Sequence, residues 1–159
     1  MRVLSRLIIV AVLVVMLALG GAESAHADQM VAASDVASLI DWVETRTNIM
    51  LLPRPRIFLS AKALGDLAGD HAQYGHETIA AYRNGRIYLL PKFWSPGNVA
   101  DDSVIVHELV HYAQDLREHS TACRNQREAE AYQLQNEYLL EHSERPIIDA
   151  VQLRLIGKC

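Results

Sequence analysis

The spacing of apolar residues predicts a helix and then a short strand at the start of the fold. Within residues 34–49 apolar side chains return every three or four positions, the period of one helix face. Ser34 or Asp35 is a candidate cap for this helix. Two prolines then exclude helix, and residues 56–59 predict a short strand. Residues 60–70 predict a short helix or a turn.

The pattern at residues 78–90 changes to two apolar and aromatic runs on either side of Asn84-Gly85. An Asn-Gly pair tolerates the positive φ angles of a two-residue type I′ turn. The stretch therefore predicts a β-hairpin whose second strand covers residues 86–90.

Helical spacing returns after the hairpin and predicts two long helices and a short C-terminal one. Asn98, Asp101 or Asp102 can cap a helix that runs to about Leu116, and the next begins near Arg124. A small antiparallel sheet made by the hairpin, packed beside this helical pair, predicts the α+β class.

Residues 1–27 have the layout of a secretory signal peptide. Two arginines precede a run of about thirteen apolar residues, and Ala25-His26-Ala27 forms a cleavage site. The run is short beside the ~20 residues of a membrane-spanning helix. We expect cleavage after Ala27, with Ala25 as the alternative. The exported protein, periplasmic or secreted, is then a single domain of residues 28–159.

Composition argues against a nucleic-acid partner. The whole chain has a formal net charge of −4, and without the charges at positions 2, 6 and 23 the remaining 13 basic and 18 acidic residues give −5. Lys and Arg form no cluster along the sequence. We expect no nucleic-acid binding and, once the signal peptide is removed, no membrane association.

The chain has two cysteines, Cys123 and Cys159. An even cysteine count in an exported protein predicts a disulfide. The alternative, metal ligation by the two thiols, lacks the short Cys-x-x-Cys spacing of zinc sites.

Residues 107–111, His-Glu-Leu-Val-His, are the strongest chemical signal in the chain. On a helix, His107 and His111 lie one turn apart on one face, so both imidazoles can bind one metal ion. Glu108 can take a proton from a water on that ion. The alternative is a pair of hydrogen-bonded core histidines. Two imidazoles and a carboxylate on one turn of an apolar helix are hard to satisfy in that way, which favours the metal.

A catalytic metal site needs a third protein ligand, and the next helix offers Glu128 and Glu130. Glu128 shares a helix face with apolar and aromatic residues, whereas Glu130 shares the more charged face. The inward carboxylate, Glu128, is therefore the predicted ligand. His119 and His142 are possible substitutes that we expect at the surface.

The motif "HELVHYAQ", followed by "CRNQREAEAYQLQNEYL", resembles the gluzincin clan of zinc metallopeptidases, and the small size resembles the minigluzincins. The same stretches are similar to a family of small, uncharacterised exported bacterial proteins. The resemblance covers about residues 82–140. In gluzincins an Asp often stands where this chain has Tyr132, so the usual carboxylate support of a histidine ligand is missing there. Asp115 or a backbone carbonyl is the candidate replacement.

The resemblance implies a zincin-like fold and one Zn²⁺ ion held by His107, His111 and Glu128. It implies hydrolysis of a peptide or protein substrate, most simply as an endopeptidase. Glu108 would act as the general base and then as the acid. A second donor would stabilise the oxyanion. Candidates for that donor are Tyr74, His76, Tyr132, Tyr138 and His142; His71 and His76 otherwise read as loop residues.

Two further alternatives stay open. In gluzincins an edge strand binds extended peptide by strand addition, and here residues 86–90 are either that strand or simply a cover for the core.

The protein is either the peptidase or a non-catalytic, zinc-stabilised binding or adaptor protein of the envelope. A binding protein has no need of Glu108, which favours the enzyme.

Overall fold

The computed structural model describes residues 28–68, 78–117 and 122–159. The expected signal peptide with both its cleavage sites, and also His71, Tyr74, His76 and His119, lie outside the described residues. The elements in chain order are β1 (Gln29–Met30), α1 (Ala33–Thr47), β2 (Arg56–Leu59), α2 (Ala61–Ala68), β3 (Ala80–Arg83), β4 (Arg86–Leu89), the 3₁₀ helix η2 (Pro91–Phe93), α3 (Val99–Leu116), α4 (Arg124–Glu141) and α5 (Ala150–Ile156).

The α+β class is confirmed, but the sheet is mixed rather than an antiparallel hairpin alone. Its four strands lie in the order β1-β2-β4-β3. β2 pairs with β4 in parallel, while β1–β2 and β3–β4 are antiparallel. A parallel pair needs a crossover connection, and the chain passes through α2 between β2 and the hairpin. The two-residue strand β1 was not expected from the sequence.

This strand order corrects the expected edge strand. β4, the second strand of the hairpin, has a partner on each side, so its backbone offers no free edge to a peptide. The edge on that side of the sheet is β3. The first hairpin strand, not the second, is therefore the candidate for strand addition.

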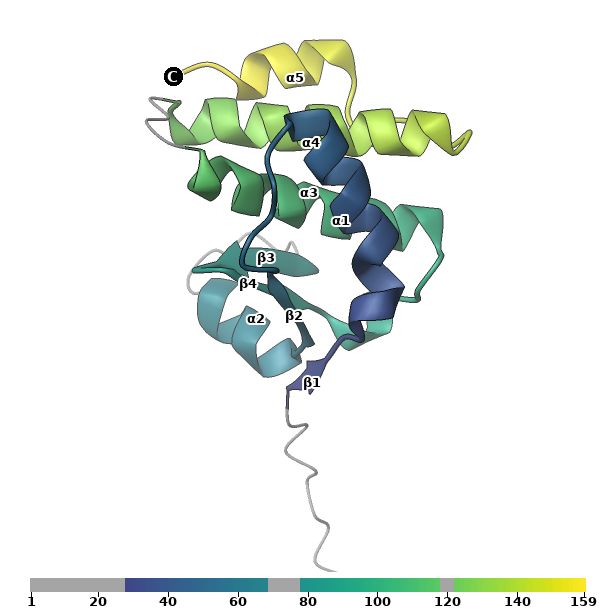
Figure 1. Ribbon diagram of the computed structural model, residues 1–159. Helices are drawn as coiled ribbons and strands as arrows, with labels where there is room; N and C mark the ends of the chain where they lie inside the picture. The colour runs from purple at the N-terminus through teal and green to yellow at the C-terminus, as the bar shows by residue number, and fades with distance from the viewer. Residues whose placement is uncertain (1–27, 69–77, 118–121) are drawn as a thin grey trace, which may run out of the picture.

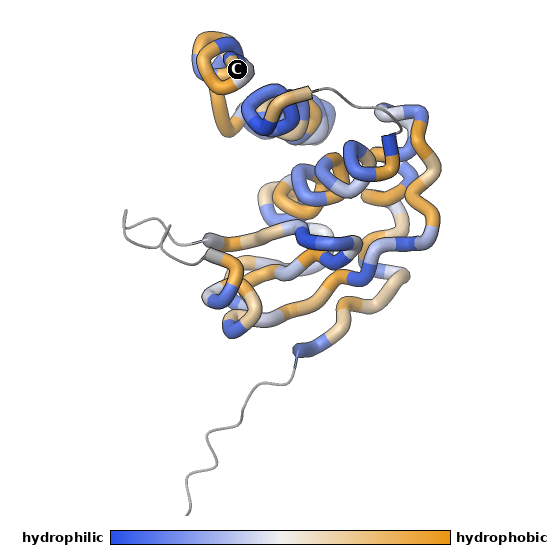
Figure 2. Tube along the Cα trace, turned by 90° about the vertical axis from the view of Figure 1, so that its left-hand side faces the viewer, coloured by the Kyte–Doolittle hydropathy of each residue, from blue (hydrophilic) through white to orange (hydrophobic). Residues whose placement is uncertain are grey.

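The helices form layers on the inner face of the sheet, and α2 covers the outer face (Figure 1). α3 lies over the sheet, α4 lies over α3, and α5 lies outside α4, while α1 crosses the side of this stack. Figure 2 shows apolar segments along the strands and in the helices that face them. Ile57, Ile87 and Leu89 of the strands meet Ile105 and Leu109 of α3 in the core, all nearly inaccessible to water.

Local signals account for the turn and for most helix ends. Asn84 and Gly85 have φ angles of 50° and 74°, as the type I′ hairpin requires. The side chain of Asn98 caps α3 by accepting a hydrogen bond from the Asp101 amide at 3.1 Å. The expected cap of α1 is wrong: the helix begins at Ala33 with no side-chain cap, because Ser34 donates to Asp35 and both residues lie inside the helix.

None of the helices formed by the described residues is long and apolar enough to span a bilayer.

A disulfide joins Cys123, directly before α4, to the C-terminal Cys159. It holds α5 against the outer side of α4. Two hydrogen bonds support the same contact: Asn125 donates to the Lys158 carbonyl at 2.6 Å, and Asn136 donates to the Ile148 carbonyl at 2.8 Å. The bond therefore ties the chain terminus to the helix that carries Glu128.

We expect the double variant Cys123→Ser/Cys159→Ser to lose about 4 kcal/mol of unfolding free energy, the chain-entropy cost of opening a loop with a sequence separation of 36 residues. Urea denaturation of the oxidised wild type and of the double variant measures this. Reductant should destabilise the wild type and leave the variant unchanged. Equal midpoints in oxidised wild type and variant would contradict the prediction.

Candidate metal centre

The seam between α3 and α4 brings His107, His111 and Glu128 together. The two histidines lie one turn apart on α3, and Glu128 comes from the second turn of α4. Their Nε2 atoms are 3.1 Å apart, and each is 3.5 Å from Oε2 of Glu128. One ligand atom from each of the three residues lies within 4.8 Å of the others, so a single ion can contact all three.

A buried amide sets the tautomer of His107. Its Nδ1 lies 3.2 Å from Oε1 of Gln135. The Gln135 amide donates to the Ser103 hydroxyl, which in turn donates to the Ala100 carbonyl. The amide oxygen must therefore accept, and Nδ1 of His107 must carry the proton. The lone pair of this imidazole is left on Nε2, which faces the seam.

Gln114 does the same for His111. The Gln114 amide donates to the Arg127 carbonyl at 2.9 Å and to Glu130 at 3.1 Å, two groups that only accept. Its oxygen accepts from Arg127 Nε and faces His111 Nδ1 at 2.9 Å. Nδ1 of His111 is therefore the protonated nitrogen, and Nε2 faces the seam with its lone pair.

The structure corrects the expected orienting group. Asp115 contacts neither histidine; it accepts from the Tyr82 hydroxyl and from Arg127. Side-chain amides do the orienting instead of a carboxylate or a backbone carbonyl. The sequence signal for them is a glutamine on the buried side of each helix: Gln114 is three residues after His111, and Gln135 is seven residues after Glu128.

This donor set fits a divalent cation. In the neutral tautomers two imidazole lone pairs and a carboxylate oxygen point at one another, and a positive charge between them, either a cation or a proton on Nε2, relieves the repulsion. The pKa directions describe the protonated alternative. The hydrogen bonds with His107 and His111 hold the pKa of Glu128 well below its usual range. Burial would lower the pKa of His111, but the bond with Glu128 and the charge of Glu108 raise it.

Glu108 lies next to this group on α3, with its carboxylate buried and its residue only 8% exposed. Burial raises the pKa of Glu108, and the neighbouring histidines and a backbone hydrogen bond from Tyr82 of β3 partly offset that rise. Glu108 therefore lies between the candidate ligands and the edge strand, where a carboxylate that gains and loses a proton would be needed.

The other candidate residues lie apart from the group, with one exception. Glu130 receives two hydrogen bonds from Arg117, at 2.8 and 3.1 Å, and one from Gln114, and it forms no hydrogen bond with either histidine. His142 is exposed, as expected, and lies about 21 Å along the helix from Glu128. Tyr138 packs against His142 there. Tyr132 is the exception, because its ring centroid is 4.5 Å from that of His107.

The group is open to solvent on one side. A pocket of about 310 Å³ is lined by Tyr82, His111, Arg124, Arg127 and Glu128, together with Ala122. It connects the edge strand β3 to two of the three candidate ligands. A metal site with an accessible face leaves a coordination position for water or substrate.

The chain belongs to the family described as a domain of unknown function (DUF6647), whose model matches residues 28–159. No curated protein and no solved structure matches the chain.

We expect the purified protein to bind about one Zn²⁺ per chain. His107→Ala and His111→Ala should lower both the zinc content and the thermal midpoint, because each removes a ligand. Glu128→Gln should weaken binding by at least ~100-fold. Glu130→Gln, which touches the site only through Gln114, should weaken it by about tenfold. A competition titration with a chromogenic chelator measures both. The reverse order of the two glutamate variants would refute the assignment.

Proposed function

We propose that this protein is an exported zinc-dependent metallopeptidase. The observation that carries the proposal is the convergence of two oriented imidazoles and a carboxylate beside a second, buried carboxylate, Glu108. This is the set of groups that peptide hydrolysis by a metal-activated water requires. The disulfide supports an oxidising compartment, and therefore export.

Zinc is the ion that this donor set suits best. Two imidazole nitrogens and one carboxylate are too few and too nitrogen-rich for Mg²⁺ or Ca²⁺, which prefer six or more oxygens. When bound, a zinc ion supplies Lewis-acid activation of water and of the substrate carbonyl. His107, His111 and Glu128 would hold it, with Gln135 and Gln114 keeping the two imidazoles aimed.

Glu108 is the proposed proton carrier. Its carboxylate takes the proton of the attacking water and returns it to the leaving amine. Burial raises the pKa of Glu108, which makes its protonated form easier to reach than that of a solvated carboxylate. Tyr132 is the proposed oxyanion donor, since it alone among the described candidates contacts a ligand. Burial raises the pKa of its hydroxyl, so the group keeps its proton.

The outer edge of β3, where the Tyr82 amide faces Glu108, is the proposed substrate strand. Leu90 donates to the Ile79 carbonyl at 2.8 Å, so residues 79 and 90 form a hydrogen-bonded pair of the antiparallel ladder. Such pairs alternate with pairs whose amides and carbonyls point outward. Ala80 and Tyr82 are therefore the outward-facing residues of β3. Tyr82 lines the pocket at the metal centre, so a peptide added to this edge would pass the site.

A zincin-like fold is the finer proposal. An edge strand antiparallel to its neighbour, a helix with two ligands beneath it, and a second helix with the third ligand are consistent with that architecture. The mixed four-stranded sheet is also consistent with it.

We expect Glu108→Gln to keep zinc but to lower chelator-sensitive cleavage of casein or a peptide library by at least 100-fold, because the amide cannot accept the proton. Glu144→Gln, an exposed carboxylate beyond the end of α4, is the matched control and should cleave at the wild-type rate. Undiminished cleavage by Glu108→Gln would refute the mechanism. A wild type that binds zinc but cleaves nothing would favour the non-catalytic binding protein.

We expect Ala80→Pro to raise KM about fivefold with little change in stability, because it removes one outward amide, worth about 1 kcal/mol, and no bond of the ladder. Ala81→Pro is the matched control: it removes an amide paired with β4 and should lower the thermal midpoint instead. Steady-state kinetics and thermal melts of both variants measure this. An unchanged KM in a folded Ala80→Pro protein would exclude β3 as the substrate strand.

A further inference from the structure

Three arginines form a row across the outer face of the sheet, on the side away from α3. Arg56 of β2 is in register with Arg86 of β4, and Arg86 is in register with Arg83 of β3. Adjacent strands are about 4.8 Å apart, so the three side chains leave the sheet as near neighbours. All three are exposed. In the sequence they are separated by up to 30 positions, and no basic cluster is visible.

None of the three arginines contacts a carboxylate in the part of the chain that the structure describes. Of the seven other described arginines, four pair with Asp or Glu, namely Arg46, Arg54, Arg117 and Arg127. Like charges directly opposite on neighbouring strands destabilise a sheet. The chain has more Asp and Glu than Lys and Arg, so carboxylate partners are plentiful. Three positive charges nevertheless lie side by side with no carboxylate partner among the described residues.

Protection of a sheet edge does not explain the row. Charged residues on edge strands prevent edge-to-edge aggregation, and this reason applies to Arg83 on β3. It does not apply to Arg86, because β4 is an inner strand with partners on both sides. Arg56 has a partner on β4 but lies beyond the two residues of β2 that pair with β1. The charge at the centre of the row, Arg86, therefore needs another reason.

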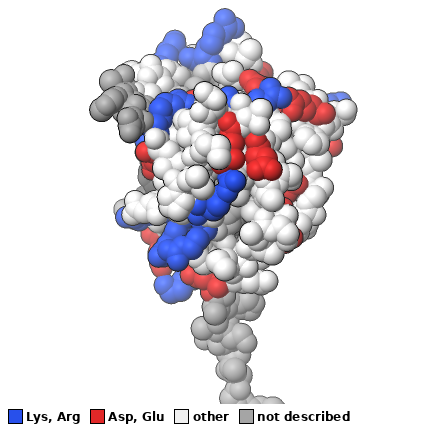
Figure 3. Space-filling view, viewed as in Figure 1, with Lys and Arg blue, Asp and Glu red and all other residues white. Residues whose placement is uncertain are grey.

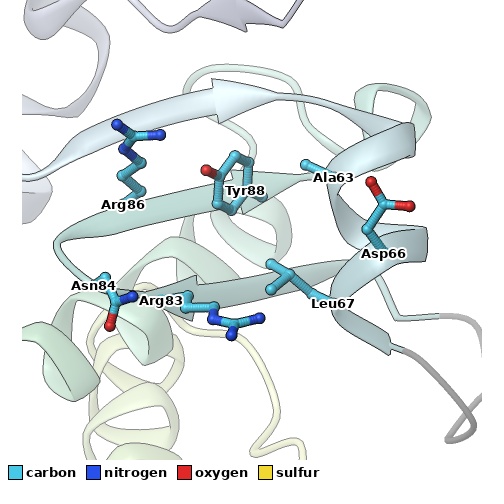
Figure 4. A pocket seen from close by; sticks show the side chains of 7 residues that line it. All are labelled: Ala63, Asp66, Leu67, Arg83, Asn84, Arg86 and Tyr88. Carbon is cyan, nitrogen blue, oxygen red and sulfur yellow. The ribbon is translucent and has the colours of Figure 1, made fainter.

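The row borders a pocket of about 450 Å³ between the hairpin and α2. Figure 4 shows Arg83, Asn84 and Arg86 at the hairpin end, Tyr88 in the middle, and α2 with Ala63, Asp66 and Leu67 at the other end. Figure 3 shows a group of Lys and Arg side chains low on the molecule, over the region of α2 and the strands. Among the described residues of the lining, Asp66 is the one acidic side chain, and it is paired with Lys62 at 2.7 Å.

We propose that this outer pocket binds a small ligand that carries two or more phosphate groups. The guanidinium groups of Arg83 and Arg86 present planar forks of donors that match phosphate oxygens, and Asn84, at the hairpin turn, adds an amide donor to the lining. Arg56 lies outside the lining but adds its charge beside Arg86. The negative charge of a bound phosphate would offset the repulsion among the three arginines. We therefore expect the ligand to stabilise the sheet. The pocket is separate from the metal centre, which lies across the sheet beyond β3.

Isothermal titration of the purified protein with sodium pyrophosphate at low salt tests the proposal. We expect one binding event on the wild type. Arg83→Gln and Arg86→Gln should each weaken it at least tenfold. Arg145→Gln, an exposed arginine in the loop after α4, is the matched control for loss of one charge and should bind as the wild type does. Vesicles of phosphatidylglycerol and of phosphatidylcholine distinguish the two sources of phosphate. Binding only to phosphatidylglycerol vesicles would identify a lipid headgroup as the ligand. Binding to neither kind of vesicle would identify a soluble phosphate ligand.

Thermal melts give a second test, because a variant that loses affinity for pyrophosphate should not lose stability in its absence. Without ligand, Arg86→Gln should melt at or above the wild-type midpoint because it relieves repulsion. Pyrophosphate should raise the midpoint of the wild type and of Arg145→Gln but not that of Arg83→Gln or Arg86→Gln. Pyrophosphate binding that both pocket variants retain would place the anion elsewhere, such as at a metal ion, and would overturn the proposal. So would the absence of binding to the wild type.

Discussion

Three hydrogen-bond acceptors, two imidazoles and a carboxylate, meet at the seam between α3 and α4, and much of the local structure is arranged around them. The imidazoles of His107 and His111 and the carboxylate of Glu128 turn their acceptor atoms toward one point. Nothing apolar could stabilise that meeting, whereas a proton on an imidazole or a cation held between the three groups could. The helices are held in place around it by the core beneath α3, by the paired hydrogen bonds of Arg117 to Glu130, and by the disulfide behind α4. The acceptors are thus fixed by contacts that do not themselves involve a metal.

Local rules in the sequence were sufficient for the helices, the hairpin turn and the candidate ligands. The Asn84-Gly85 pair admits few backbone conformations, and it takes the expected one. The four-residue spacing of His107 and His111 places them on one face wherever a helix forms. Helical phase alone distinguishes Glu128, which faces the histidines, from Glu130, which faces Arg117. Each of these inferences depends on residues within one or two turns of one another.

Features that depend on distant pairing could not be read from the chain in the same way. The parallel pairing of β2 with β4 joins segments separated by a crossover, and no local pattern specifies it. Because of that pairing the edge strand is β3, whereas the sequence suggests β4. The same pairing aligns Arg56 with Arg86. Gln114 and Gln135 were visible as buried-face amides, but their partners are fixed only once the two helices dock. The expected role of Asp115 failed for the same reason, because Tyr82 and Arg127 approach it from other elements.

The β-hairpin has a geometric consequence of its own. Tyr82 and Arg83 are consecutive residues, so their side chains point to opposite faces of β3, one toward the helices and one toward the outer pocket. The same short stretch of backbone therefore positions one residue of each pocket.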